Sequence, residues 1–160
     1  MSYIGEWEAD GRQSLLIIQP AVIDVFSKHA QHDGRAPEAG GILLGYVRGH
    51  HLEVVQATEP TKFDTRMRFF FQRLAIWHAK IAQSRWEDSA GLVRYLGEWH
   101  THPEIIPNPS PLDLEEWRNL ANARRDMRPS LGIIVGIEFL HVELMGNDGN
   151  RRIYKPLSEG

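Results

Sequence analysis

Residues 97–103 read Gly-Glu-Trp-His-Thr-His-Pro, and residues 110–113 read Ser-Pro-Leu-Asp. Side chains two residues apart on a β-strand point to the same face, so a strand here projects His100 and His102 together. Pro103 lacks the backbone N–H that an interior strand needs, and we expect the strand to end before it. The first stretch therefore predicts two imidazoles side by side at a strand end.

The second stretch has the features of a helix start. Ser110 is a typical N-cap residue, proline is favoured at the first helical position, and Asp113 falls in the first turn. Apolar residues then recur at spacings of three and four, at Leu114, Trp117 and Leu120-Ala121. We expect a helix over residues 111–125, with Asp113 beside the connecting loop and facing back toward the strand end.

Two histidines and one carboxylate, with water as the fourth ligand, form an open zinc site. Such a metal lowers the pKa of its water and polarises a carbonyl. The composition agrees with this ligand set, because the chain has eight histidines and no cysteine. Helix capping by itself also explains Ser110 and Asp113. The two functions are compatible, because a serine can cap through one lone pair and still present its hydroxyl.

A hydrolytic zinc site also needs a group that carries protons. The sequence offers five carboxylates for this purpose: Glu38, Glu98, Glu104, Glu115 and Glu116. Glu98 shares the strand face of His100. Glu38 precedes two glycines that would let another backbone approach closely, so its carboxylate could overhang a site on a neighbouring strand. Spacing alone does not choose between Glu38 and Glu98.

Strand and helix patterns alternate along the rest of the chain, which is typical of an α/β protein. We predict a single mixed β-sheet with flanking helices, in one domain over residues 1–160. The expected strands cover residues 14–18, 41–47, 52–57, 67–70, 92–102, 131–137, 139–145 and 152–155, and the expected helices cover residues 20–30, 74–86 and 111–125.

The composition is that of a globular protein, with 42% hydrophobic and 24% charged residues. Eighteen basic residues against 21 acidic ones give a net charge of −3, which offers no general attraction to nucleic acid or anionic lipid. No apolar run approaches the roughly 20 residues of a membrane helix, and the N-terminus does not resemble a signal peptide. Together with the lack of cysteine, this predicts a cytoplasmic protein that binds neither nucleic acid nor membranes.

The two stretches resemble the signature of the JAMM (JAB/MPN-plus) metalloproteases, which is an upstream glutamate, His-Ser/Thr-His-Pro and then Ser-x-x-Asp. Residues 100–103 and 110–113 match it in type and spacing. Residues 38–45, Glu-Ala-Gly-Gly-Ile-Leu-Leu-Gly, are similar to the family's Glu-x-x-Gly-Ile-Leu-x-Gly strand, which favours Glu38 as the base. The resemblance implies an MPN/JAB-like fold with cytidine-deaminase-like layering over residues 15–154.

The resemblance also implies a function for each matching residue. His100, His102 and Asp113 would bind Zn2+. Glu38 would take a proton from water and pass it to the leaving amine, and Ser110 would hydrogen-bond the oxyanion or the water. Members of the family cut isopeptide or peptide bonds that follow the C-terminal glycine of ubiquitin or ubiquitin-like proteins.

The chain lacks the long insertions of eukaryotic deubiquitinases and resembles the bacterial stand-alone JAB proteins. We expect it to be similar to the deconjugating peptidases of CBASS anti-phage operons, which release a CD-NTase (a cyclic-oligonucleotide synthase) from molecules attached to its C-terminus. Two alternatives are a JAB peptidase that trims a small sulfur-carrier-type ubiquitin-like protein, and a module that binds such tails without cutting them. Glu98 stands where many eukaryotic members carry an aromatic residue, which indicates an accessory or surface acid.

Other residues receive mostly structural interpretations. By resemblance, residues 61–72 lie near the substrate groove, where Arg66, Arg68 and Phe70 could touch the bound tail. His50 and His51 fit a polar hairpin turn. The remaining histidines outside the motif have no partner at ligand spacing: His29, His32, His78 and His141. Four tryptophans are expected to be packing residues: Trp7, Trp77, Trp86 and Trp117.

Overall fold

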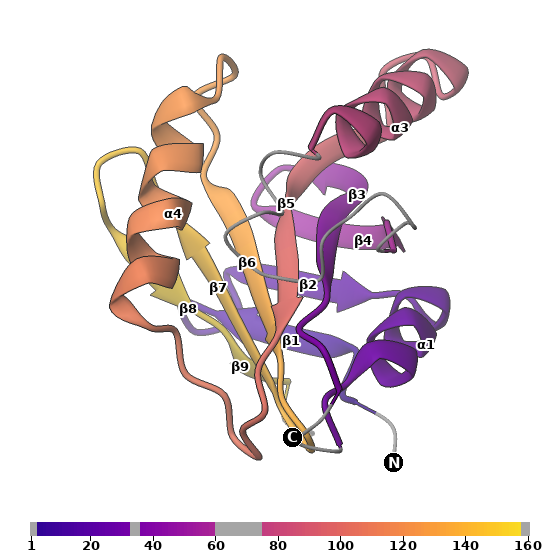
Figure 1. Ribbon diagram of the computed structural model, residues 1–160. Helices are drawn as coiled ribbons and strands as arrows, with labels where there is room; N and C mark the ends of the chain where they lie inside the picture. Colours follow the sequence, from indigo (N-terminus) through magenta and orange to yellow (C-terminus); the bar gives the residue numbers. More distant parts are fainter. Residues whose placement is uncertain (1–2, 33–35, 60–74, 158–160) are drawn as a thin grey trace.

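The computed structural model describes residues 3–32, 36–59 and 75–157 (Figure 1). Within them, nine strands form one sheet in the order β8-β7-β6-β5-β3-β4-β2-β1-β9. The strands are β1 (Glu6–Ala9), β2 (Ser14–Ile18), β3 (Gly40–Arg48), β4 (His51–Ala57), β5 (Arg94–Thr101), β6 (Ser130–Val135), β7 (Leu140–Met145), β8 (Arg151–Ile153) and β9 (Lys155–Pro156). The helices are α1 (Pro20–His29), α3 (Ala75–Asp88) and α4 (Pro111–Ala123). The predicted α/β class, a mixed sheet with flanking helices, is confirmed.

The helices cover both faces of the sheet (Figure 1). On one face, Phe26 of α1 is fully buried, and its ring centroid lies 5.3 Å from that of Trp99. On the other face, α4 packs on β6 through Trp117 and Ile134. There α3 also packs on β3, through Ile81 against Ile42. None of the described helices is both long and apolar enough to cross a membrane.

The last part of the sheet differs from the prediction of one strand over residues 152–155. The structure has two short strands there, β8 on β7 and β9 on β1, at opposite edges of the sheet order. Tyr154 alone separates them, with its backbone N–H donating to the Val142 carbonyl at 2.9 Å and its hydroxyl 2.9 Å from Ser14 Oγ. The sheet therefore curls until its two edges meet at one buried tyrosine, which local pattern cannot reveal.

Two further features differ from the sequence analysis. β1 was not among the expected strands; within it Glu8 is buried, with Arg12 Nε 3.2 Å from its carboxylate. Trp86 was expected to be a packing residue but is 42% exposed, and the Arg94 guanidinium lies 5.7 Å from its ring centroid. Trp7 and Trp117 are buried as predicted. The strand expected over residues 67–70 and the side chain of Trp77 lie outside the described residues.

We expect Phe26→Ala to lower the free energy of unfolding by about 3–5 kcal/mol, because it leaves a cavity under the sheet. Ile17→Ala is the matched control, since Ile17 is 45% exposed on β2, and it should cost less than about 1 kcal/mol. Urea denaturation followed by tryptophan fluorescence measures both. Equal losses in the two variants would contradict the assignment of Phe26 to the core.

Candidate metal centre

The end of β5 delivers the two histidines as the alternation predicts. His100 lies opposite Gly40 of β3 and Ile134 of β6, on the face that α4 covers. Trp99 points to the other face, where it contacts Phe26. His102 follows the strand and stays attached to the sheet, because its backbone N–H donates to the Val135 carbonyl at 3.0 Å. Both imidazoles therefore start from a fixed strand end.

A close approach of β3 to β5 brings Glu38 to the same place. A Cβ atom on Gly40 would lie 2.7 Å from the Trp99 carbonyl oxygen, so the two backbones approach to a distance that only glycine allows. Beyond it, the Ala39 N–H donates to Thr101 Oγ1 and the Thr101 N–H donates to the Ala39 carbonyl, both at 2.9 Å. Glu38 comes one residue earlier, and single ligand atoms of Glu38, His100 and His102 all lie within 4.8 Å of one another.

The start of α4 brings the third donor. The Asp113 N–H donates to Ser110 Oγ at 3.1 Å, and the Ser110 N–H donates to Asp113 Oδ2 at 2.7 Å, which is a complete capping box. The same carboxylate faces the histidines, with Oδ1 3.0 Å from His100 Nε2 and Oδ2 3.4 Å from His102 Nε2. Asp113 is fully buried. It therefore both caps the helix and lines the site.

The spacing of these donors fits a tetrahedral metal ion. Ligands about 2.0–2.1 Å from a shared zinc ion lie roughly 3.3 Å from one another. The two Nε2 atoms of His100 and His102 are 3.2 Å apart, and the Asp113 oxygens lie 3.0 and 3.4 Å from them. The set of two imidazoles and one carboxylate is that of open zinc sites.

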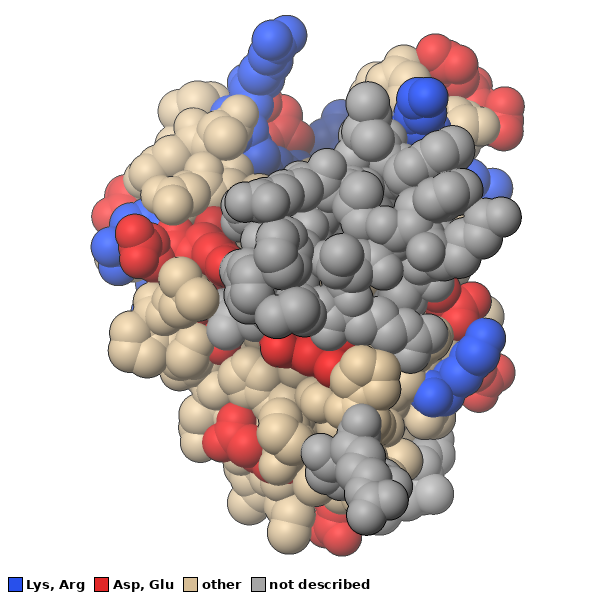
Figure 2. Space-filling model, in the orientation of Figure 1, with Lys and Arg blue, Asp and Glu red and all other residues tan. Residues whose placement is uncertain are grey.

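Hydrogen bonds between the ionisable groups of the site shift the pKa values of Asp113 and His102. Burial by itself raises the pKa of Asp113, but hydrogen bonds with His100 and His102 outweigh it and hold this pKa far below its usual range. Burial lowers the pKa of His102, but Asp113 and Glu104 outweigh it and raise this pKa. The buried, anionic carboxylate of Asp113 therefore favours a cation at the site. On the face drawn in Figure 2, acidic side chains lie near the middle as well as at the margins, and basic ones lie at the margins.

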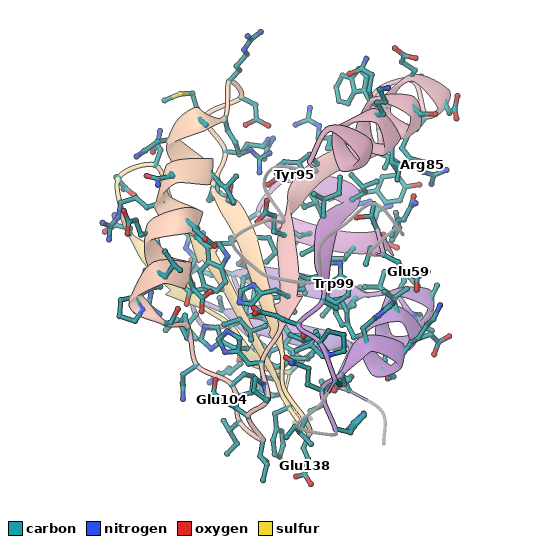
Figure 3. All side chains as sticks on the ribbon, in the orientation of Figure 1. Glu59, Arg85, Tyr95, Trp99, Glu104 and Glu138 are labelled. Carbon is teal, nitrogen blue, oxygen red and sulfur yellow. The ribbon has the colours of Figure 1, made fainter. Side chains whose placement is uncertain are left out.

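The other candidate carboxylates lie in different places. Glu98 shares the His100 face and lines an apolar hollow between α3 and α4, with Ile42, Trp86 and Leu120. Glu104 lies in the loop between β5 and α4 (Figure 3). Glu115 and Glu116 lie on α4. Of the five candidates, Glu38 is the one that forms a group of possible metal ligands with both His100 and His102 among the described residues.

The Trp117 ring packs beside the His100 ring, although Trp117 was predicted only as a packing residue. Its ring centroid lies 6.1 Å from that of His100, and on its other side it stacks on His141 at 6.5 Å with an interplanar angle of 5°. His141 Nε2 in turn lies 2.7 Å from Glu143 Oε1, and Glu143 is fully buried. Sequence reasoning missed this pair, although residues two apart on a predicted strand share a face.

Two of the other histidines that the structure describes lie outside the site. His29 lies 2.9 Å from Glu59, and His50 lies in the turn before β4. The expected groove residues Arg66, Arg68 and Phe70, like the side chain of His78, lie outside the described residues.

Within the described residues, a curled mixed sheet carries α1 on one face and α3 and α4 on the other, and three donors converge at the end of its central strand β5. Together these features define an α/β fold with a candidate metal centre. The chain belongs to the family of prokaryotic homologues of the JAB domain, whose sequence model matches residues 19–150. The JAB-like fold and the resemblance to bacterial JAB proteins are confirmed.

Named relatives align with most of the chain. A CD-NTase/cGAS isopeptidase from Pseudomonas aeruginosa (strain BWHPSA011 / Pa011) is 43% identical over 157 residues, which are 98% of this chain and 99% of the relative. A protein of the same name from Vibrio cholerae is 38% identical over 109 residues, 68% of this chain and 70% of the relative. A Desulfitobacterium hafniense protein known from its solution structure shares the fold, with a TM-score of 0.60 and 19% identity over 89% of this chain and 91% of that one.

We expect Glu143→Gln to lower the free energy of unfolding at pH 7 by about 1–3 kcal/mol, because a buried charge-assisted hydrogen bond is lost. Burial raises the pKa of Glu143, but Arg151 and His141 outweigh it, so the folded-state pKa lies below the ordinary 4.5. A carboxyl group whose pKa is lower in the folded state stabilises the protein at pH values above its ordinary pKa. This stabilisation is lost as the pH falls through the folded-state pKa.

The difference between wild type and Glu143→Gln should therefore shrink below about pH 4.5. Urea denaturation between pH 3 and 8, with a chelator present to remove metal effects, measures it. Glu6→Gln is the control, since Glu6 is exposed on β1, and it should follow the wild-type curve. A difference that stays constant down to pH 3 would contradict an ionised Glu143 in the folded state.

Proposed function

We propose that this protein is a zinc-dependent isopeptidase or peptidase of the JAMM type. In this proposal it hydrolyses the bond that follows the C-terminus of a ubiquitin-like or ubiquitin-like-conjugated protein, and its substrate is a CD-NTase joined to other molecules in bacterial anti-phage defence. The relatives named CD-NTase/cGAS isopeptidase support this substrate, at 43% identity over nearly the whole chain for one of them. A cytoplasmic location is part of the proposal.

The convergence of His100, His102 and Asp113 at the end of β5 carries the proposal. Their donor distances of 3.0–3.4 Å suit one shared ion, so these three residues would hold Zn2+. When bound there, zinc lowers the pKa of water and polarises the scissile carbonyl. His100 and His102 would bind the ion through Nε2 as neutral imidazoles, and the low pKa of Asp113 keeps its carboxylate anionic.

Glu38 and Ser110 provide the other chemistry. Glu38 lies within 4.8 Å of the histidine donors, close enough to accept a proton from the attacking water and pass it to the leaving amine. Ser110 is held at the N-terminus of α4 by its bonds with Asp113. Its hydroxyl would donate to the oxyanion that forms when the carbonyl is attacked. The helix dipole adds positive potential at the same end.

The decisive experiment uses a CD-NTase with a fluorescent protein fused after its C-terminal residue. We expect the wild-type protein with zinc to cleave this junction, and both a chelator and Glu38→Ala to abolish cleavage. Bound zinc, measured by inductively coupled plasma mass spectrometry, should remain near one ion per chain in Glu38→Ala, because Glu38 is not assigned as a ligand. Cleavage by Glu38→Ala at the wild-type rate would contradict the assignment of Glu38 as the base.

The same assay separates the alternatives. His100→Ala should lose both zinc and cleavage, whereas His50→Ala, in the turn before β4, should keep both. A zinc-loaded wild type that leaves the fusion intact but trims a sulfur-carrier-type protein to its terminal glycine would favour the processing peptidase. Binding of either tail without cleavage of either would favour the tail-binding module.

Ser110 is expected to have two separable effects. Ser110→Ala removes the cap and the hydroxyl, so it should cost about 0.5–2 kcal/mol of stability and about 10²–10³-fold in kcat. Ser110→Asn keeps a capping oxygen and should restore most of the stability without restoring kcat. Thermal unfolding and fusion-protein kinetics measure the two effects. Recovery of kcat together with stability in Ser110→Asn would reduce Ser110 to a helix cap.

A further inference from the structure

Glu104 contacts the outer nitrogen of a candidate ligand. Its Oε1 lies 2.8 Å from His102 Nδ1, while His102 Nε2 lies 3.2 Å from His100 Nε2 on the inner side of the ring. A neutral imidazole carries its proton on one nitrogen and a lone pair on the other. A carboxylate accepts hydrogen bonds only, so a proton on Nδ1 satisfies Glu104 and leaves the Nε2 lone pair on the inner side of the ring, available to a metal ion.

The turn between β6 and β7 holds the backbone of Glu104 in place. The Ile137 N–H donates to the Glu104 carbonyl at 2.7 Å, and the Tyr3 hydroxyl donates to the Gly136 carbonyl at 2.6 Å. A Cβ atom on Gly136 would lie 2.7 Å from the Glu104 carbonyl oxygen, so the turn and the loop are in close contact. Although its side chain is 47% exposed, Glu104 therefore extends from an anchored point beside His102.

Glu104 contacts the site through the imidazole ring of His102. Glu104 bonds the nitrogen of His102 that points away from Asp113, so its carboxylate is not among the three converging donors. A carboxylate in this place fixes the ring orientation and the tautomer of a metal-binding histidine and raises its basicity. Removal of such a partner typically weakens metal binding by about 10–100-fold.

We propose that Glu104 is a positioning residue that holds His102 in the Nδ1–H tautomer, with Nε2 directed at the metal. This inference rests on the proposed zinc site. Glu104 touches neither the ion nor the substrate and acts only through His102.

The test compares Glu104→Ala, Glu104→Gln and the control Glu138→Ala. Glu138 is an exposed acid on the adjacent turn, with its backbone N–H 3.4 Å from the Ile105 carbonyl (Figure 3). Zinc affinity is measured by competition with a chromophoric chelator. We expect Glu104→Ala to bind zinc about 10–100-fold more weakly, and Glu138→Ala to stay within about twofold of wild type. Glu104→Gln keeps an acceptor oxygen and should lose less than about tenfold.

A spectroscopic signature separates positioning from a general loss of structure. In zinc-loaded wild type, long-range 1H–15N correlation spectra should show His102 protonated at Nδ1, and Glu104→Ala should lose the slow exchange of that proton while the backbone amide spectrum is retained. Equal zinc affinity in Glu104→Ala and Glu138→Ala, or an Nε2–H tautomer of His102 in the wild type, would overturn the inference. A wild type that binds no zinc would instead overturn the proposed function itself.

Discussion

The close contact between the start of β3 and the end of β5 is the constraint on which the site depends. Two adjacent glycines remove the side chains that would otherwise separate these strands, and a Cβ on Gly41 would clash with the Thr58 carbonyl on the opposite side. The reciprocal bonds between Ala39 and Thr101 then fix the register. As a result, a glutamate just before β3 and two histidines at the end of β5 reach one point, although about 60 residues separate them in the sequence.

The cap of α4 connects folding with chemistry. Asp113 Oδ2 accepts a hydrogen bond from the Ser110 N–H. Its Oδ1 also faces His100, and its Oδ2 also faces His102. A buried anion is costly unless it is paired, and here the pairing comes from groups on two different elements. Packing of α4 on β6 therefore places the third donor next to the histidines that compensate its charge. The site is complete only when the helix, through Trp117, is packed on the sheet.

Local pattern predicted the parts of the molecule that local physics determines. The His-x-His alternation, the proline that ends the strand and the serine cap each act within a few residues, and the structure brings their side chains together as expected. Closure of the sheet could not be predicted in this way, because Tyr154 finds its partners on β7 and β2, more than ten residues away in sequence. The contact of Glu104 with His102 depends on the anchoring turn at Gly136, which is equally non-local. The pair of His141 and Glu143 was readable from its spacing but was overlooked.

The curl of the sheet at Tyr154 has a consequence for association between copies of the chain. An exposed sheet edge offers unpaired N–H and C=O groups to any other strand. Here the strands that finish the two edges, β8 and β9, come from the same short segment, and both are brief and carry arginine, lysine or proline. Six residues at the C-terminal end of the sheet, 151–156, thus protect both long edges. Their detachment would uncover β1 and β7 at once and turn a self-contained sheet into one open to intermolecular pairing at both ends.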